Sequence, residues 1–153
     1  MAEVPRYVVD SSVALRWYLK DEPHREHAMK VLDDWDQDRI VLLAPSIIYA
    51  EIASGLRNAT RAMQRPRMSN TDGLDALAAF LDFDLQTTPF ERLIPDAYIL
   101  SGRLGCSVYD ALFLSLADLA QCPIVYADDR LRRGLGNRFP LALWIEDYQS
   151  SKS

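Results

Sequence analysis

The sequence predicts an α/β protein, a three-layer α/β/α domain around a mainly parallel sheet. Short apolar runs alternate with segments whose apolar residues recur at helical spacing. Within the runs the apolar residues are consecutive, as expected of strands that helices cover on both faces. No linker or low-complexity segment interrupts this alternation, so we expect one domain over residues 1–148 and a polar tail over residues 149–153.

The first part of the chain predicts two strands separated by two helices. A strand is expected at residues 7–9, and Ser11 or Ser12 is suited to cap the helix that follows it. After an acidic, proline-containing break, apolar residues at helical spacing predict a second helix over residues 24–35. The apolar run at residues 40–44 predicts the second strand.

The middle of the chain predicts two helices joined by its most loop-like segment. Pro45 and Ser46 are expected to start the first helix, because proline is tolerated in or just before the first turn. Residues 64–71 form the loop-like segment. Within it, Ser69 or Thr71 is suited to cap the second helix.

A short strand and another helix are expected next. Residues 85–87 have the character of a third strand, and Pro89 leads into a helical pattern over residues 93–104. Gly105 follows that pattern directly, where glycine is favoured as a C-terminal stop.

Residues 107–131 predict a helix, a tight turn and a buried strand. Ser107 is suited to cap the helix, with Asp110 at the third helical position, which resembles a capping box. The buried strand is expected at residues 124–127, directly before Asp128. The apolar positions of the helix are Leu112, Phe113, Leu116, Leu119 and Ala120. A short basic helix at residues 131–136 and a last strand at residues 141–145 complete the expected elements.

Net charge limits the classes of partner. The net charge of −5 has the wrong sign for a protein that coats nucleic acid without specificity. Arginine nevertheless gathers locally, and arginine suits bidentate contacts to phosphate. We therefore expect Arg130, Arg132 and Arg133 to contact substrate, with a solvated helix face as the alternative. The two local groups are Arg57, Arg61, Arg65 and Arg67, and Arg130, Arg132, Arg133 and Arg138.

No segment predicts export or a membrane span. No apolar run approaches the ~20 residues that a span needs, and the first residues lack the pattern of a signal peptide. We therefore expect a cytoplasmic protein with no membrane partner. Cys106 and Cys122 bracket a helix whose ends are ~20 Å apart, so both should be free thiols. His24 and His27 are expected to form a solvated surface pair.

Four acidic residues follow expected strands or begin the next helices. They are Asp10, Glu51, Asp110 and Asp128. The carboxyl ends of parallel strands and the N-termini of their helices open onto one edge of a sheet, so these side chains can meet there. For Asp110 and Asp128 the alternative role is helix capping, and for Glu51 it is an exposed helical position.

Carboxylates gathered in this way require a cation or protonation. Two of them about 4 Å apart repel by about 4 kcal/mol at an effective dielectric constant of about 20. Oxygen ligands without cysteine or a nearby histidine favour Mg²⁺, with Mn²⁺ as a substitute. Such sites hydrolyse phosphodiesters with a metal-activated water. Ser11 and Ser12 are therefore expected to serve as a cap and as a water or phosphate contact, and not as nucleophiles.

Four segments resemble the motifs of the PIN-domain family, and in particular its VapC-type toxins. VVDSSVALRWYL, PSIIYAEIASGL, SVYDALFLSLA and VYADDRL are similar to the first to fourth motifs. The resemblance assigns metal binding and catalysis to Asp10, Glu51, Asp110 and Asp128. Ser12 matches the polar residue beside the first acid.

The resemblance implies a PIN-like α/β/α nuclease domain. Its activity would be that of a Mg²⁺-dependent endoribonuclease, usually a homodimer, that an antitoxin silences by covering the active site. The chain departs from the fourth motif at Tyr126, where threonine or serine is common two residues before the acid. Asp129 follows Asp128 directly and is expected to be an auxiliary metal ligand acting through water.

Three other functions compete with this interpretation. The first is a binding scaffold with weak or no nuclease activity, which Tyr126 and the negative net charge favour. A haloacid-dehalogenase phosphatase would need a second aspartate two residues after Asp10, where Ser12 stands. A phosphoacceptor receiver domain would need a lysine after a late strand, and none lies between Lys30 and Lys152.

Overall fold

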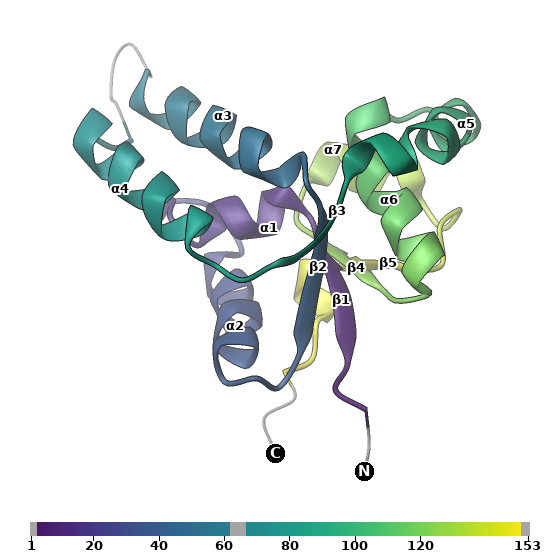
Figure 1. Ribbon diagram of the computed structural model, residues 1–153, viewed down its shortest axis with the longest axis horizontal. Helices are drawn as coiled ribbons and strands as arrows, with labels where there is room; N and C mark the ends of the chain where they lie inside the picture. The colour runs from purple at the N-terminus through teal and green to yellow at the C-terminus, as the bar shows by residue number, and fades with distance from the viewer. Residues whose placement is uncertain (1–2, 62–66, 151–153) are drawn as a thin grey trace.

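A five-stranded sheet forms the centre of the computed structural model, which describes residues 3–61 and 67–150 (Figure 1). The strand order is β3-β2-β1-β4-β5, and all four strand pairs are parallel. The predicted α/β class is confirmed, and the sheet is parallel throughout. The strands are β1 (Arg6–Val9), β2 (Val41–Pro45), β3 (Gln86–Thr88), β4 (Ile124–Tyr126) and β5 (Ala142–Trp144).

Strand β1 occupies the middle of the sheet. Val8 pairs with Leu43 of β2 on one side and with Ile124 of β4 on the other. Val8, Val9 and Ile124 are fully buried. Consecutive buried apolar residues are typical of a parallel strand with helices on both faces.

The helices form two layers around the sheet (Figure 1). Helices α1 and α2 lie on one face, and α6, with α5 packed against it, lies on the other and contacts β1 and β2. Helices α3 and α4 pack together and extend from the α1 side. The α-helices are α1 (Ser11–Arg16), α2 (Arg25–Asp36), α3 (Ile48–Thr60), α4 (Asn70–Leu81), α5 (Ile94–Leu104), α6 (Val108–Ala120) and α7 (Asp129–Leu135). Two short 3₁₀ helices are η1 (Phe90–Leu93) and η2 (Ile145–Asp147).

The strand order places a topological switch point between β1 and β4. The chain leaves β1 through α1 and α2 on one face, and it enters β4 from α6 on the other. In open parallel sheets, ligands bind beyond the carboxyl ends of the strands at such a point. Any site formed by the segments after β1 and β4 therefore lies where this fold is suited to hold one.

Several predicted helix boundaries are confirmed. Ser69 and Ser107 accept hydrogen bonds from the backbone amides of Asp72 and Asp110, so each serine caps its helix. Gly105 ends α5 with a φ of 69°, a left-handed conformation that glycine adopts without strain.

Other predicted boundaries were wrong. Asp10, and neither Ser11 nor Ser12, is the N-cap of α1. Pro45 ends β2, and α3 begins only at Ile48, because the backbone N–H of Ser46 still donates to Thr88 of the neighbouring strand.

Smaller differences concern the last elements of the chain. Leu119 is exposed although its spacing in α6 predicted burial. The basic helix begins at Asp129, two residues earlier than expected. Residues 64–66 of the predicted loop at residues 64–71, including Arg65, lie outside the described residues.

Within residues 3–61 and 67–150 no single helix is long and apolar enough to cross a membrane. One pair of helical segments, Phe90–Leu104 and Val108–Ala120, has the length and composition of a span when taken together, but the pair is bent by 110°.

Candidate functional site

Asp10 follows the central strand and is one of the most deeply buried carboxylates. Its side chain is the N-cap of α1, and the residue is 4% exposed. Its Oδ2 atom accepts hydrogen bonds from the Ser12 backbone N–H at 3.1 Å and from the Ser12 hydroxyl at 2.5 Å. Both hydrogen bonds come from its own helix, so no positive charge is supplied to it there.

Ser12 connects the ends of β1 and β4. Its hydroxyl donates to Asp10 and accepts a hydrogen bond from the Ala127 backbone N–H at 2.9 Å. This side chain therefore joins the two segments that flank the switch point. Its predicted contact with substrate stays a prediction.

Glu51 reaches the same region from the first turn of α3. The residue is partly buried, and the Ser11 hydroxyl donates to its Oε1 atom at 3.0 Å. Burial, followed by the charge of Asp10, raises the Glu51 pKa to about 7, although the hydrogen bond from Ser11 acts in the opposite direction. Glu51 is therefore not the freely solvated helical glutamate of the alternative interpretation.

Asp110 and Asp128 each stand in the first turn, or at the cap, of a helix. Asp110 follows the Ser107 cap of α6. Asp128 caps α7 by accepting hydrogen bonds from the backbone amides of Arg130 and Leu131 at 2.9 and 3.1 Å. The capping role considered for Asp128 is thus real, but it does not prevent the same carboxylate from facing other acids.

The electrostatic interactions of these carboxylates converge. Burial raises the Asp10 pKa to about 6, and the charges of Asp110 and Asp128 also raise it. Burial likewise raises the Asp110 pKa; Asp128 adds to that rise, whereas the Ser107 hydrogen bond and the Arg130 charge lower it. The folded chain therefore brings Asp10, Glu51, Asp110 and Asp128 into one electrostatically coupled group, which we call the acid pocket.

The acid pocket is chemically suited to a hard divalent cation. It offers only oxygen donors, and the buried carboxylates repel one another. In the described part of the chain, no group of three or more histidine, cysteine, aspartate or glutamate residues is close enough to form a ready metal cage. Mg²⁺ usually keeps several waters and takes one or two carboxylates directly, so it does not require such a cage.

Helix α7 carries the remaining predicted site residues. Asp129 and the three arginines that follow it are exposed. Arg130 is close enough to Asp110 to lower its pKa. The Arg132 guanidinium carbon lies 4.3 Å from the centre of the Trp144 ring, a cation–π contact that orients this side chain. Arg133 is exposed on the same helix, so a basic surface borders the acid pocket.

The ring of Tyr126 packs against Trp144 at the end of β4. The residue is buried, and the two rings meet edge to face with centroids 5.4 Å apart. Among the described residues, its hydroxyl makes no hydrogen bond to an acidic side chain. Ser12 instead supplies the hydroxyl that bonds to Asp10 beside the end of β4.

Residues outside the acid pocket agree with most expectations. Cys106 and Cys122 are free thiols. His24 and His27 are partly exposed, and the nearest ion-pair partner of His24 is Glu146 at 3.7 Å. In the other arginine group, Arg67 forms ion pairs with acids of the α1–α2 connection, so it is engaged in structure.

One buried cluster was missed by the sequence analysis. Asp34 is completely buried near the end of α2 and accepts from Arg39 at 2.8 Å, from the Tyr148 hydroxyl at 2.5 Å and from Ser150 at 2.9 Å. These partners lie up to 116 residues away in the sequence, so no local pattern reveals them. Ser150 belongs to the predicted polar tail, of which residues 151–153 lie outside the described part.

Comparisons with known proteins identify relatives of the chain. The PIN domain family matches residues 7–134. The chain is 34% identical over 124 residues to the VapC ribonuclease Mb0985 of Mycobacterium bovis. The matched segment covers 81% of this chain and 87% of that protein. Ribonuclease VapC9 of Mycobacterium tuberculosis is similar to the same extent. The match includes all four residues of the acid pocket.

Proposed function

Because this chain belongs to the PIN-domain family, we propose that it is a divalent-metal-dependent endoribonuclease and the toxin of a type II toxin–antitoxin pair. Relatives named as VapC ribonucleases support an action on RNA. The observation that carries the proposal is the environment of Asp10. This carboxylate is buried at the end of the central strand, beside two further carboxylates, with Ser12 as its hydrogen-bond partner.

The acid pocket would hold Mg²⁺, or Mn²⁺ in its place. When bound, such an ion lowers the pKa of its water, aligns that water with phosphorus and stabilises the leaving oxygen. Ser12 and Ser11 orient Asp10 and Glu51 by direct hydrogen bonds. The arginines of α7 would bind RNA phosphates beside the pocket, with Arg130 nearest to Asp110. Asp129 would assist through water from the first residue of that helix.

A metal titration tests this function. Purified protein is incubated with a structured RNA at increasing Mg²⁺ or Mn²⁺, and cleavage should rise with the ion and stop with a chelator. Asp110→Asn should abolish cleavage, whereas Asp75→Asn, a matched change at an exposed position of α4, should leave it unchanged. If wild-type protein cleaves no RNA at any concentration of either ion, the proposal is wrong.

A catalytically weak scaffold is the alternative function. It is favoured by Tyr126, whose buried ring packs on Trp144 and leaves Asp128 without a hydroxyl partner from that position. Under this alternative the chain would bind a partner protein without cleaving RNA at any metal concentration. The same titration therefore separates the two functions.

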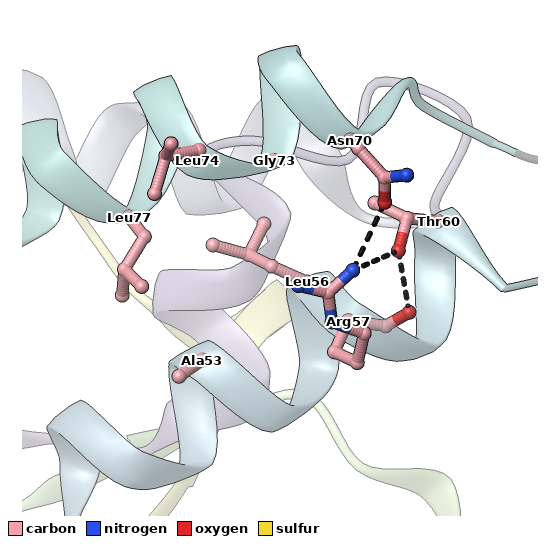
Figure 2. Close-up of a pocket in the computed structure, with 8 residues that line it drawn as sticks. All are labelled: Ala53, Leu56, Arg57, Thr60, Asn70, Gly73, Leu74 and Leu77. Atoms are coloured by element: carbon pink, nitrogen blue, oxygen red, sulfur yellow. Dashed lines mark hydrogen bonds between the residues drawn. The ribbon is translucent and has the colours of Figure 1, made fainter.

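The antitoxin is the partner that the family membership suggests, and the groove between α3 and α4 is suited to it. Apolar side chains from both helices surround a small cavity of about 60 Å³. Figure 2 shows Arg57 at the edge of this cavity, donating to Asn70. Leu74 is exposed beside this cavity. We propose that an apolar segment of the antitoxin occupies the groove, whose lining residues are Ala53, Leu56, Arg57, Thr60, Asn70, Gly73, Leu74 and Leu77.

A second copy of the chain is proposed to cover the outer face of α5 and α6. Tyr98, Ile99 and Leu119 are large apolar residues exposed on this face. Arg103 and Asp118 place both signs of charge beside Ile99 and Leu119, which suits a self-complementary two-fold interface. Ile99→Asp should convert a dimer into a monomer in light-scattering measurements, and a wild-type monomer would exclude this interface.

A further inference from the structure

The contact between α1 and α3 repeats after one helical turn. Ser11 lies against Glu51, where the hydroxyl donates to Oε1 at 3.0 Å. Four residues later on each helix, Leu15 lies against Gly55. Residues four apart share one face of a helix, so these two contacts are successive rungs of a single helix interface. The polar rung is at the acid pocket, and the apolar rung is one turn away from it.

A larger residue at position 55 would require Leu15 or α3 to move. A Cβ atom built on Gly55 would lie 2.6 and 2.9 Å from the two terminal methyl carbons of Leu15 and 3.3 Å from Leu15 Cγ. The first two distances are too short for real carbon contacts, so either Leu15 or the whole of α3 would have to shift. Glycine is a poor residue for a helix interior, which makes close approach the physical reason for its presence here.

The same interface controls where Glu51 stands. Glu51 reaches the acid pocket from α3, whereas Asp10 reaches it from the segment that begins α1. The separation of the two helices therefore sets the separation of the two carboxylates. Among the described residues, the Ser11 hydroxyl is the recorded hydrogen-bond donor to the Glu51 side chain.

We infer that Ser11 and Gly55 are positioning residues that set the distance and orientation of Glu51 relative to Asp10, and thereby the affinity of the acid pocket for its ion. Ser11 acts by a direct hydrogen bond, and Gly55 acts by allowing α3 to approach Leu15. This inference rests on the proposed metal-dependent function. It adds two residues to which we assign no direct contact with the metal ion or with RNA.

The test uses the full chain, with Mn²⁺ alone as the probe for binding and one RNA substrate for kinetics. Ser11→Ala should weaken Mn²⁺ binding about 10-fold, the range typical of a residue that orients a ligand. Its kcat should fall by a similar factor, whereas KM for RNA should change little, because the RNA contacts are intact. Ser11→Thr keeps a hydroxyl and should stay within about 2-fold of wild type.

The role of Gly55 is tested by a substitution that creates a clash with Leu15 and by a second substitution that removes this clash. Gly55→Ala should weaken Mn²⁺ binding, and Leu15→Ala in the same chain should restore much of it, because it removes all three atoms that the new Cβ meets. Ser54→Ala on the exposed side of α3 and Gly102→Ala on α5, where nothing lies within 4 Å of the new Cβ, are the matched controls. Both controls should bind Mn²⁺ like the wild type.

The outcomes separate this inference from the proposed function. If the wild type binds Mn²⁺ and cleaves RNA while Ser11→Ala does both equally well, the positioning role is wrong and the nuclease function stands. If the wild type neither binds Mn²⁺ nor cleaves RNA, both are wrong. Should Gly55→Ala fail to fold, Ser11→Ala still decides the question, because it removes one hydroxyl and introduces no clash.

Discussion

Asp10 and Asp34 are both almost completely buried, but the charges around them have opposite signs. Asp34 has an arginine, a tyrosine hydroxyl and a serine hydroxyl as partners. Asp10 has the hydroxyl and amide of Ser12, and the nearest charges that act on it are those of other carboxylates. A buried charge that is fully paired contributes to the structure, whereas one surrounded by like charges is stable only with a proton or a cation. The comparison therefore separates an aspartate paired within the structure from one that we propose binds the metal ion.

The largest expected effect is the loss of RNA cleavage when Asp10, the proposed metal ligand, is replaced. Asp10→Asn should reduce metal-dependent RNA cleavage by at least about 100-fold, because it removes a proposed ligand. The metal-free variant should be as stable as the wild type or more stable at pH 7.5, since a repulsive buried charge is gone. Cleavage assays and urea unfolding with a chelator measure the two quantities. A variant that cleaves normally would remove the functional half of the comparison.

The same substitution at the structural aspartate should have the opposite pattern. Asp34→Asn should lower the free energy of unfolding by about 3 kcal/mol, because Arg39 and two hydroxyls lose a charged acceptor. RNA cleavage per folded molecule should be unchanged. If urea unfolding shows Asp34→Asn to be neutral, the network around Asp34 does not stabilise the fold.

The pH dependence of stability sharpens the comparison further. The Asp10 pKa is raised from 3.8 to about 6 and the Glu51 pKa from 4.5 to about 7, so between pH 5 and 7 the folded chain binds more protons than the unfolded chain. The free energy of unfolding of metal-free protein should therefore fall as pH rises through this window, by on the order of 1 kcal/mol. Asp10→Asn should flatten this dependence in unfolding curves recorded with a chelator.

Carboxyl groups with a lowered pKa do not oppose this trend in stability between pH 5 and 7. A hydrogen bond from Arg67 lowers the pKa of Asp21, and one from Trp144 lowers the pKa of Glu146. The stability that these two groups contribute is therefore lost only when the solution becomes more acidic than their ordinary pKa values. A rise in stability between pH 5 and 7 would contradict the uncompensated charge assigned to the acid pocket.

The smallest effect on the fold is expected at the cations of α7. Arg130, Arg132 and Arg133 replaced together by alanine should leave stability nearly unchanged, in contrast to the buried ion pair of Asp34. RNA binding should weaken, and its salt dependence should decrease by about 0.7 per lost phosphate contact. Filter binding at several salt concentrations measures this slope, with Arg92→Ala as the control. An unchanged slope would remove these arginines from the RNA surface.

Sequence reasoning predicted the parts of the fold that depend on local chemistry. Ser69 and Ser107 were found as caps and Gly105 as a stop because each acts within a few residues of itself. The cap of α1 was missed because Asp10, Ser11 and Ser12 are all good caps. Which of the three becomes the cap depends on where β1 ends and on distant partners. Ser11 is engaged by Glu51, and Ser12 is engaged by Ala127.

The candidate site was likewise predictable only in part. Four acids after strands or at helix starts indicated one edge of the sheet, and the structure couples their charges there. Their metal-binding and catalytic roles stay a prediction. The close approach of Gly55 to Leu15 could not be foreseen, because it depends on how two helices pack. Asp34 was missed for a related reason, since its partners at positions 148 and 150 are adjacent only in the folded chain.

The bond from Ser150 to Asp34 has a practical consequence. It holds the end of the described chain beside the last turn of α2, which leads into the start of β2, and β1 starts at that same edge of the sheet. Both described ends thus emerge at the edge of the sheet opposite the carboxyl ends of the strands (Figure 1). A bead, dye or fusion partner tethered through either end should leave the edge that carries the acid pocket facing free solution.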